Sequence, residues 1–508
     1  MDNLLKKQTI SVSHYALDCQ EECAISGDYT LPEYCPDVAT VLKCLVTPRV
    51  QNRQWSGEQL LVDGVAAVRV LYLDEERRCL REAEFTQPFS CTMRTEGRVD
   101  AVPAALELST KYVNCRAVGP RRLEVRGAIA LSARAECAVD SEFTLASEDP
   151  HLYTRCETAA FDTPVGSSEK VLAISESLDF PETLPPAEML LGGDCRAAIR
   201  ECRVLTGKAI VKGQVYFHQL YTDDLNAGTT HCLDFAVPFS QILDVDGAED
   251  GQPHTAHVLL LSDTERCTVG PDGENSVLEV TAKLLVQFRA YRRCEVPLLL
   301  DAYHGRCPVT VDTRDVSLRA HMGCRWENTV LPMQLELPAG VLQEILDVWA
   351  QPQGLDNCCE KGTACISGRL LVCMLVRDGD GQIAYYERPE EYRLEYPCSG
   401  NHLQAQVTVT ELHYRVVDNN LELKVTLCVA LEMGQHTTRR MIQNVRLHQD
   451  APYGEQRATT LLYYAQPGEE LWEIGRKCHT SPDWIRQEND LSGDRLGQSS
   501  VLIVPIVS

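Results

Sequence analysis

The sequence lacks an excess of positive charge. Its 48 Lys and Arg residues face 73 Asp and Glu residues, which gives a formal net charge of −25. Its longest basic clusters are pairs such as Arg121-Arg122, Arg292-Arg293 and Arg439-Arg440. Nucleic-acid binding depends on cationic side chains that displace counterions from phosphates, so this composition argues against a nucleic-acid partner. The same balance argues against electrostatic docking onto an anionic membrane.

Long apolar runs are also missing. The best candidate, at 296–300, has five residues, whereas a membrane-spanning helix needs about 18. No apolar stretch of the kind found in secretory signals follows the first seven residues. We therefore expect a protein without a transmembrane segment that resides in the cytoplasm.

Familiar reaction motifs are absent as well. The chain has no His-Glu-x-x-His, no Gly-x-Ser-x-Gly and no phosphate loop. Gly207-Lys208 lacks the glycine and hydroxyl residue of a phosphate loop, and Ser167-x-x-Lys170 lacks the companion motifs of a nucleophilic serine. We therefore predict a non-enzymatic protein with no catalytic residues and no cofactor.

The 23 cysteines are scattered along the chain. A disulfide scaffold would be short and would carry its cysteines in dense groups, so we expect reduced, mostly buried thiols in a reducing cytosol. Zinc sites usually use Cys-x₂-Cys pairs, and none is present. The four cysteines within 358–373 are interpreted as buried thiols, and Cys19, Cys23 and His14 form only a weak metal candidate. The sequence therefore predicts no metal site.

The chain does contain an order of features that recurs three times. Each copy opens with a Leu-Pro pair, spaced by 153 residues, at Leu31-Pro32, Leu184-Pro185 and Leu337-Pro338. A glycine then leads a strand and a hairpin, at Gly64, Gly213 and Gly368. The hairpins run to Pro88-Phe89-Ser90, Pro238-Phe239-Ser240 and Glu395-Tyr396-Pro397. Their turns are the polar stretches 74–76, 223–226 and 378–381, the last containing the Asp-Gly pairs that favour hairpins.

Each copy also has a late strand that starts with Leu-Glu, at 123–131, 278–286 and 421–431. Apolar and polar residues alternate in these segments, which indicates one buried face and one wet face. Burying five or six apolar side chains gives about 10 kcal/mol as an upper estimate, comparable to the net stability of a domain. We therefore expect this strand to be central in each copy.

The sequence thus predicts a mainly β protein with three tandem small antiparallel repeats, each a sandwich or a partly open barrel. We place the repeats at 1–155, 156–300 and 301–450. Within them, 36–42 favours a helical turn with Pro36 at its first position, and 158–178 is interpreted as a linker or edge segment. Residues 450–460 are interpreted as a hinge.

The last segment, 461–508, predicts a strand, two helices and a strand. Pro467-Gly468 is a turn, and Glu469 and Glu470 supply negative charge to a first helical turn. Ser481-Pro482 is a typical start for the second helix. We expect the apolar residues Leu471, Ile474 and Ile485 to share a core.

This segment resembles the LysM family. Matching positions are Gly468, Leu471, Trp472, Ile474, Ile485, Asn489, Leu491, Leu502, Val504 and Pro505. The resemblance implies a groove for N-acetylglucosamine polymers between two loops. By position, its residues would be Pro467, Gly468, Glu469, Glu470, Trp472, Asn489, Asp490, Leu491, Ser492 and Gly493. This copy departs from the family pattern because Glu469-Glu470 replaces Asp-Thr and about two extra residues lie in 497–500.

The repeats resemble the SPOCS domain of endospore-forming Firmicutes. The matching element is Leu31-Pro32 followed by Pro36-Asp37-Val38 and Val41-Leu42. Several such repeats before one terminal LysM module is the layout of a clostridial spore-morphogenesis family. The resemblance implies a scaffold in the mother-cell cytosol that binds the ATPase of the basal coat layer at the forespore surface. The alternative is a wall-associated protein that binds peptidoglycan through its LysM module.

Overall fold

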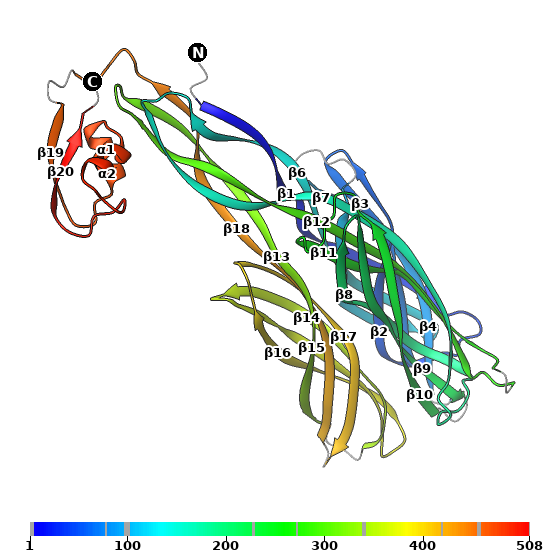
Figure 1. Ribbon diagram of the computed structural model, residues 1–508. Coiled ribbons are helices and arrows are strands. Elements are labelled where there is room, and N and C mark those ends of the chain that lie inside the picture. The colour runs from blue at the N-terminus through cyan, green and yellow to red at the C-terminus, as the bar shows by residue number, and fades with distance from the viewer. Residues whose placement is uncertain are drawn as a thin grey trace.

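The computed structural model describes residues 5–76, 79–95, 102–225, 229–270, 273–337, 342–417, 420–454 and 459–506. These residues form antiparallel sheets almost throughout, with two short helices near the C-terminus (Figure 1). The prediction of a mainly β protein is confirmed. Within the described ranges, no helix is long and apolar enough to cross a membrane.

Eighteen long strands form three successive units of six. The first unit consists of β1 (Leu5–Thr30), β2 (Val38–Ser56), β3 (Gln59–Asp74), β4 (Leu80–Arg94), β5 (Ala104–Gly119) and β6 (Arg122–Ser147). The second consists of β7 (Leu152–Asp179), β8 (Met189–Leu205), β9 (Lys208–Asp224), β10 (Thr229–Asp244), β11 (His254–Thr268) and β12 (Val277–His304). The third consists of β13 (Val309–Glu336), β14 (Leu342–Glu360), β15 (Thr363–Asp378), β16 (Ile383–Pro397), β17 (His402–Val417) and β18 (Asn420–Leu447).

All three units have the same topology. The second to fourth strands form one meander, as in β2-β3-β4, and the first, last and fifth strands form a second sheet, as in β1-β6-β5. The late strands β6, β12 and β18 are each the middle strand of their sheet, so the prediction that they are central is confirmed. The polar turns do join hairpins, β3 to β4, β9 to β10 and β15 to β16, although Asn226 lies outside the described residues.

The two sheets of each unit face one another across an apolar core. In the first unit, Val68 and Val70 of β3 pack in one cluster with Leu123 and Ile129 of β6. The second and third units have equivalent clusters between their two sheets. Each unit is therefore a sandwich rather than a closed barrel.

The repeated glycines allow an aromatic ring to lie over the middle strand of each meander. A Cβ at Gly64 would lie 2.4 Å from the Phe89 ring, and one at Gly213 would lie 2.5 Å from the Phe239 ring. Each ring belongs to the residue directly opposite the glycine on the next strand. In the third unit that residue is Tyr392, so the match of Tyr396 to Phe89 is wrong by four residues.

The Leu-Pro match also needs correction in the second copy. After β1, the Leu31 amide donates to the Arg121 carbonyl. The equivalent donor after β7 is Phe180, which precedes Pro181 and bonds to Ser276. The second counterpart of Leu31-Pro32 is thus Phe180-Pro181 rather than Leu184-Pro185. In the third copy, Pro338 lies outside the described residues.

The prediction of a helical turn at 36–42 is wrong because of strand irregularity. Residues 38–42 belong to strand β2, which has register shifts between Val38 and Thr40 and between Val41 and Lys43. Such bulges break the alternation of side chains and leave apolar residues at helix-like spacing. For 158–178, the edge alternative is confirmed and the linker alternative is not, since this stretch is part of β7, an edge strand of its sheet.

The first and last strands of each unit extend beyond their sandwich as a two-stranded arm. In β6, residues beyond Ala135 pair with β1 alone, and β12 and β18 behave in the same way. A register shift marks the start of each arm, at Tyr15/Leu17, Ala290/Tyr291 and His321/Gly323. The three arms pack together through a shared apolar cluster, formed by Val12, Phe143, Phe161, Val296, Leu298, Val316, Leu318 and Met441.

The meanders of the three units also meet. Their outer faces contribute leucines and one tryptophan to a second apolar cluster, which we call the outer-face cluster. It consists of Leu71, Leu73, Leu80, Leu191, Leu220, Leu346, Trp349, Cys373, Leu375 and Ile383. The units are therefore joined at the arms and again at the meanders.

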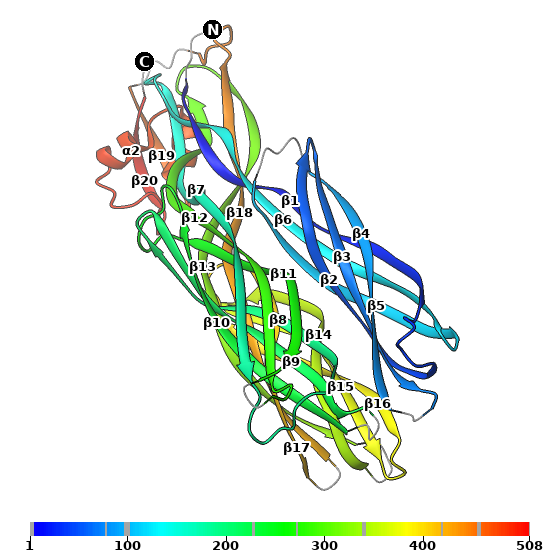
Figure 2. The same cartoon turned by 90° about the vertical axis from the view of Figure 1, so that its right-hand side faces the viewer.

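The C-terminal segment forms β19 (Thr460–Ala465), α1 (Leu471–Cys478), α2 (Pro482–Glu488) and β20 (Ser500–Pro505). Leu471, Ile474 and Ile485 are fully buried in one core with Leu502 and Val504, as expected. Figures 1 and 2 place this module beside the ends of the arms, at the same end of the molecule as the N-terminus. Part of the expected hinge is held in place, since the Tyr453 amide bonds to the Arg306 carbonyl at 2.9 Å, and 455–458 lie outside the described residues.

One cysteine pair departs from the expectation of reduced thiols. Cys359 and Cys398, on β14 and just after β16, form a disulfide. The other 21 cysteines are free, ten of them buried and only Cys156 and Cys358 exposed. Proximity across the meander, which sequence spacing does not reveal, brings the bonded pair together.

Candidate functional site

The predicted groove loops lie next to one another in the C-terminal module. The Gly468 amide donates to the Leu496 carbonyl at 2.7 Å, and the Leu496 amide donates to Glu469 at 3.0 Å. The Leu471 amide bonds to Asp494 at 2.8 Å. The loop before α1 is therefore hydrogen-bonded to residues 494–496, which directly follow the predicted second loop.

Glu469, which stands where the LysM pattern has Asp, is used internally. Its carboxylate accepts hydrogen bonds from the Gln466 amide at 2.8 Å, from Tyr463 at 3.0 Å and from Lys477 at 3.1 Å. The backbone bond from Gln466 and the bond from Lys477 lower the pKa of this carboxyl group. Glu469 thus fixes the turn between β19 and α1.

Asn489 links the end of α2 to the last strand. Its amide group donates to the carbonyls of Ile485 and Ile503, both at 2.7 Å, and its oxygen accepts from the Ile503 amide at 2.7 Å. All of its side-chain polar atoms therefore have partners within the module. This geometry gives Asn489 a structural role.

Trp472 and Glu470 face the second arm. The Trp472 indole donates to Asp301 at 2.8 Å, and its ring meets the Tyr303 ring edge-on at 4.8 Å. Glu470 pairs with Arg155 at 2.9 Å. Arg476 also contacts Asp301. Two residues of the predicted groove are thus engaged with β7 and β12.

The other predicted groove residues lie at the surface. Pro467, Gly468, Asp490, Ser492 and Gly493 are exposed, while Leu491 is half-buried against the module core. The β19-β20 sheet carries a strip of exposed apolar side chains. It consists of two cross-strand pairs, Leu462 with Ile503 and Tyr464 with Val501, and Tyr464 is 73% exposed.

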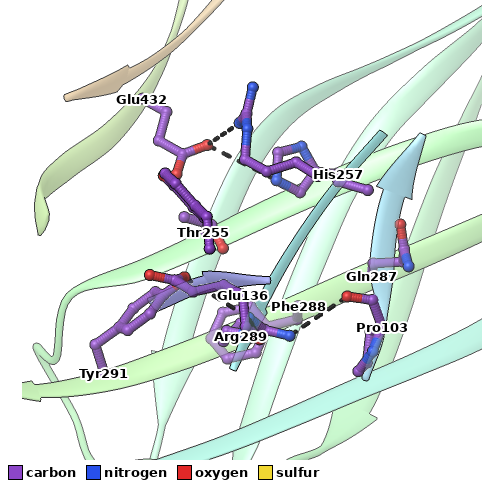
Figure 3. Close-up of a pocket in the computed structure, with 12 residues that line it drawn as sticks. Pro103, Glu136, Thr255, His257, Gln287, Phe288, Arg289, Tyr291 and Glu432 are labelled. Carbon is purple, nitrogen blue, oxygen red and sulfur yellow. Dashed lines mark hydrogen bonds and ion pairs between the residues drawn. The ribbon is translucent and has the colours of Figure 1, made fainter. Parts of the chain in front are cut away.

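A second group of functional side chains lies where the three units meet, at the start of the arms. We call this group the polar waist; it consists of Ser13, Tyr15, Glu136, Arg289, Tyr291, His321 and Glu432. Figure 3 shows four of its members, Glu136, Arg289, Tyr291 and Glu432. Glu136 of β6 accepts hydrogen bonds from Ser13 and Tyr291, and lies 3.5 Å from His321 and 3.6 Å from Arg289. Tyr291 stacks on His321 at 3.7 Å.

The waist charges compensate one another. Burial favours the neutral form of Glu136, but contacts with His321, Ser13 and Tyr291 outweigh it and lower the pKa of this carboxyl group to about 2. Burial favours neutral His321, but Glu136 and Glu432 outweigh that effect and raise its pKa. Both shifts favour the charged forms, so the two side chains, 3.5 Å apart, are suited to form an ion pair in a water-poor site.

The cavity beside the waist is too small for a substrate. It offers about 40 Å³, enough for a few water molecules, whereas small-molecule sites usually span about 300–1,000 Å³. The side chains around it hydrogen-bond or ion-pair with one another across β6, β12 and β13. This arrangement is suited to fixing the three units relative to one another.

Two groups of described residues have the donor types of a metal site. One is His218, Cys232 and Asp347, and the other is Cys195, Asp263 and Glu265. Neither includes the cysteines within 358–373, or Cys19, Cys23 and His14.

Sequence reasoning missed both the polar waist and the metal-type groups. The waist and the group of His218, Cys232 and Asp347 join different units, and the group of Cys195, Asp263 and Glu265 joins β8 to β11 within the second unit. Their members are far apart in the sequence, so no spacing along the chain marks them. One signal in the sequence could have indicated the waist. Its charged residues directly neighbour buried apolar residues within a strand, as Glu136 neighbours Ala135 and Arg289 neighbours Ala290.

Comparison with known proteins yields one family match. The family described as SipL, SPOCS domain, matches residues 186–265, which cover β8, β9, β10 and most of β11. No curated protein matches the chain. No solved structure matches it either. Over the meander and most of β11 of its second unit, the chain therefore resembles the SPOCS domain of SipL.

Proposed function

We propose that this protein is a non-enzymatic scaffold of spore-coat assembly. The match of residues 186–265 to the SipL SPOCS domain carries the proposal and supports a sporulation-related role of the SipL type. The first and third units share the strand order of the matched unit. We therefore propose that all three are SPOCS-type domains and that 461–508 is a LysM-type module.

The proposed partner is the coat-building ATPase at the forespore surface, in the mother-cell cytosol. The strip of Leu462, Tyr464, Val501 and Ile503 is the contact that we would test first. It faces away from the module core, and Trp472, Glu470 and Arg476 already attach the opposite region of the module to the body. Apolar, partly aromatic patches of this kind are typical of protein interfaces.

The test is recovery of the ATPase from sporulating cells with the full-length chain. We expect the wild type to recover it and the double variant Leu462→Ser, Tyr464→Ser to recover much less. Tyr112→Ser, which alters a 60% exposed tyrosine on β5, is the matched control and should behave as the wild type. If the wild type recovers no coat protein above background, the proposal is overturned.

Peptidoglycan binding is the alternative function. The exposed positions of Pro467, Gly468, Asp490, Ser492 and Gly493 leave the predicted loops open to a glycan. Co-sedimentation of the full-length protein with insoluble peptidoglycan at physiological salt distinguishes the two functions. Robust retention, lost on Ser492→Trp, would favour wall binding over the coat scaffold.

A further inference from the structure

A group of metal-binding side chains lies where the second and third units touch. His218 is on β9, Cys232 is on β10 and Asp347 is on β14. The first two belong to the second unit and the third to the next, so 129 residues separate His218 from Asp347. The group lies beside the outer-face cluster, to which the neighbouring residues Leu220 and Leu346 belong.

The donor atoms already converge. The imidazole Nε2 of His218 lies 3.1 Å from one carboxylate oxygen of Asp347 and 3.2 Å from the other. The donor atoms of all three side chains lie within 4.8 Å of one another. Zinc bonds of about 2.0–2.3 Å place ligand atoms roughly 3.3–3.8 Å apart in a tetrahedral site. Small side-chain rotations would therefore bring the three donors to bonding distance.

A fourth residue orients the histidine. Asp234 lies directly opposite His218 across the β9-β10 pair, and its carboxylate contacts the imidazole Nδ1 at 2.8 Å. A carboxylate on one ring nitrogen leaves the other nitrogen free to bind a metal, and this arrangement is common around protein-bound zinc. Asp234 thus supplies the outer contact that a metal-bound histidine requires.

The mixture of donors favours one class of metal. Calcium and magnesium prefer oxygen ligands alone, whereas thiolate and imidazole together favour zinc and related transition metals. The site is also enclosed, since the side chains of His218 and Asp347 are 13% and 6% exposed. Asp234 is 74% exposed and offers a route from solvent.

The second metal-type group is a poorer site because its carboxylates already have cationic partners. Arg49 contacts Asp263 at 2.7 Å, and Arg69 lies 4.0 Å from Glu265. Among the described residues, no Lys or Arg pairs with Asp347; its ion-pair partner is His218, which is itself one of the proposed ligands.

The geometry points to a zinc site in which His218 Nε2, Cys232 Sγ and one Asp347 oxygen bind the ion and a water completes the coordination. Such a site would tie β9 and β10 of the second unit to β14 of the third. Its role would be to hold the two units together, since its ligands come from both units and lie beside an apolar cluster.

Metal titration of the reduced, metal-free full-length protein tests the proposal. We expect one tightly bound Zn²⁺ per chain, and with Co²⁺ a thiolate charge-transfer band and visible absorption typical of a tetrahedral site. His218→Gln and Cys232→Ser should abolish the cobalt spectrum. Asp234→Asn should weaken zinc binding about 10- to 100-fold.

Cys195→Ser is the matched control because it alters a buried cysteine in the other metal-type group. It should leave stoichiometry and spectrum unchanged. Circular dichroism and thermal unfolding without metal identify variants that remain folded, and zinc should raise the melting temperature of the wild type but not of Cys232→Ser. Wild-type stoichiometry in folded Cys232→Ser, or loss of binding in Cys195→Ser, would overturn the proposal.

Discussion

The three units meet in two regions that use opposite chemistry. The outer-face cluster joins the meanders through apolar side chains, such as the fully buried Leu375. The polar waist joins the roots of the arms through an ionised pair, Glu136 and His321, with Arg289 and Tyr291 around it. An apolar contact tolerates small shifts, whereas a buried ion pair demands one geometry. The comparison suggests that the cluster provides cohesion and the waist provides register.

The largest expected effect comes from breaking the waist. Glu136→Ala leaves His321 and Arg289 buried without their shared anion, which typically costs about 3–5 kcal/mol. Urea denaturation followed by circular dichroism measures the free energy of unfolding.

Glu142→Ala is the control for this change because Glu142 lies on the same strand but is 48% exposed and pairs with Lys7. Exposed pairs contribute about 0–1 kcal/mol. If both variants lose the same free energy of unfolding, Glu136 contributes no more to stability than a carboxylate in a surface ion pair.

A slightly smaller loss of unfolding free energy is expected when a side chain of the outer-face cluster is shortened. Leu375→Ala removes a side chain that is 0% exposed, and such changes cost about 2–5 kcal/mol. The same denaturation experiment measures it, with Val330→Ala, at a 55% exposed position, as control. A loss of under 0.5 kcal/mol for Leu375→Ala would mean that the meanders do not pack as described.

The two regions should also differ in their response to pH. His321 has a pKa raised above 6.5, so its contribution is complete below pH 6.5 and is lost as pH rises through the folded-state pKa. Glu136 has a pKa lowered from 4.5 to about 2, so its contribution is complete above pH 4.5 and is lost as pH falls toward 2.

The measurement is the difference in unfolding free energy between the wild type and His321→Gln across this range. The difference should be largest between pH 4.5 and 6.5 and shrink on either side. Leu375→Ala should differ from the wild type by a nearly constant amount. A constant difference for His321→Gln would contradict the ionised pair.

The smallest effect is expected where the C-terminal module docks on the second arm. Asp301→Ala removes the acceptor of Trp472 and the partner of Arg476, and unpaired polar groups of this kind cost about 1–3 kcal/mol. We expect faster proteolysis within 448–454 and unchanged unfolding of the three units. Asp315→Ala, at a 66% exposed position, should leave the proteolysis rate unaltered.

Much of each sandwich could be predicted because alternation is a local property. The apolar period from Leu421 to Leu431 correctly identified β18 as a middle strand, since six of its side chains point into one core. The same reasoning failed at Val38 to Leu42, where two bulges disturb the period. It also could not anticipate the arms, because a register shift at each root changes which face is buried.

The candidate sites also contain local features that the sequence predicts and long-range contacts that it does not. Sequence reasoning correctly placed Leu471, Ile474 and Ile485 in one core, because helical spacing brings them to one face. It could not foresee that Trp472 would meet Asp301, or that His218 would meet Asp347, since both contacts join segments more than 100 residues apart.

The order of apolar and polar residues by itself determined where most strands lie, which late strand is central and which side chains form the small C-terminal core, because alternation and helical spacing mark the buried face of each element. Only the tertiary structure decided which charges face one another at the waist, which side of the last module is covered, and which cysteine lies beside which histidine. Those contacts depend on how three similar units pack, and packing brings together side chains that the chain itself holds far apart.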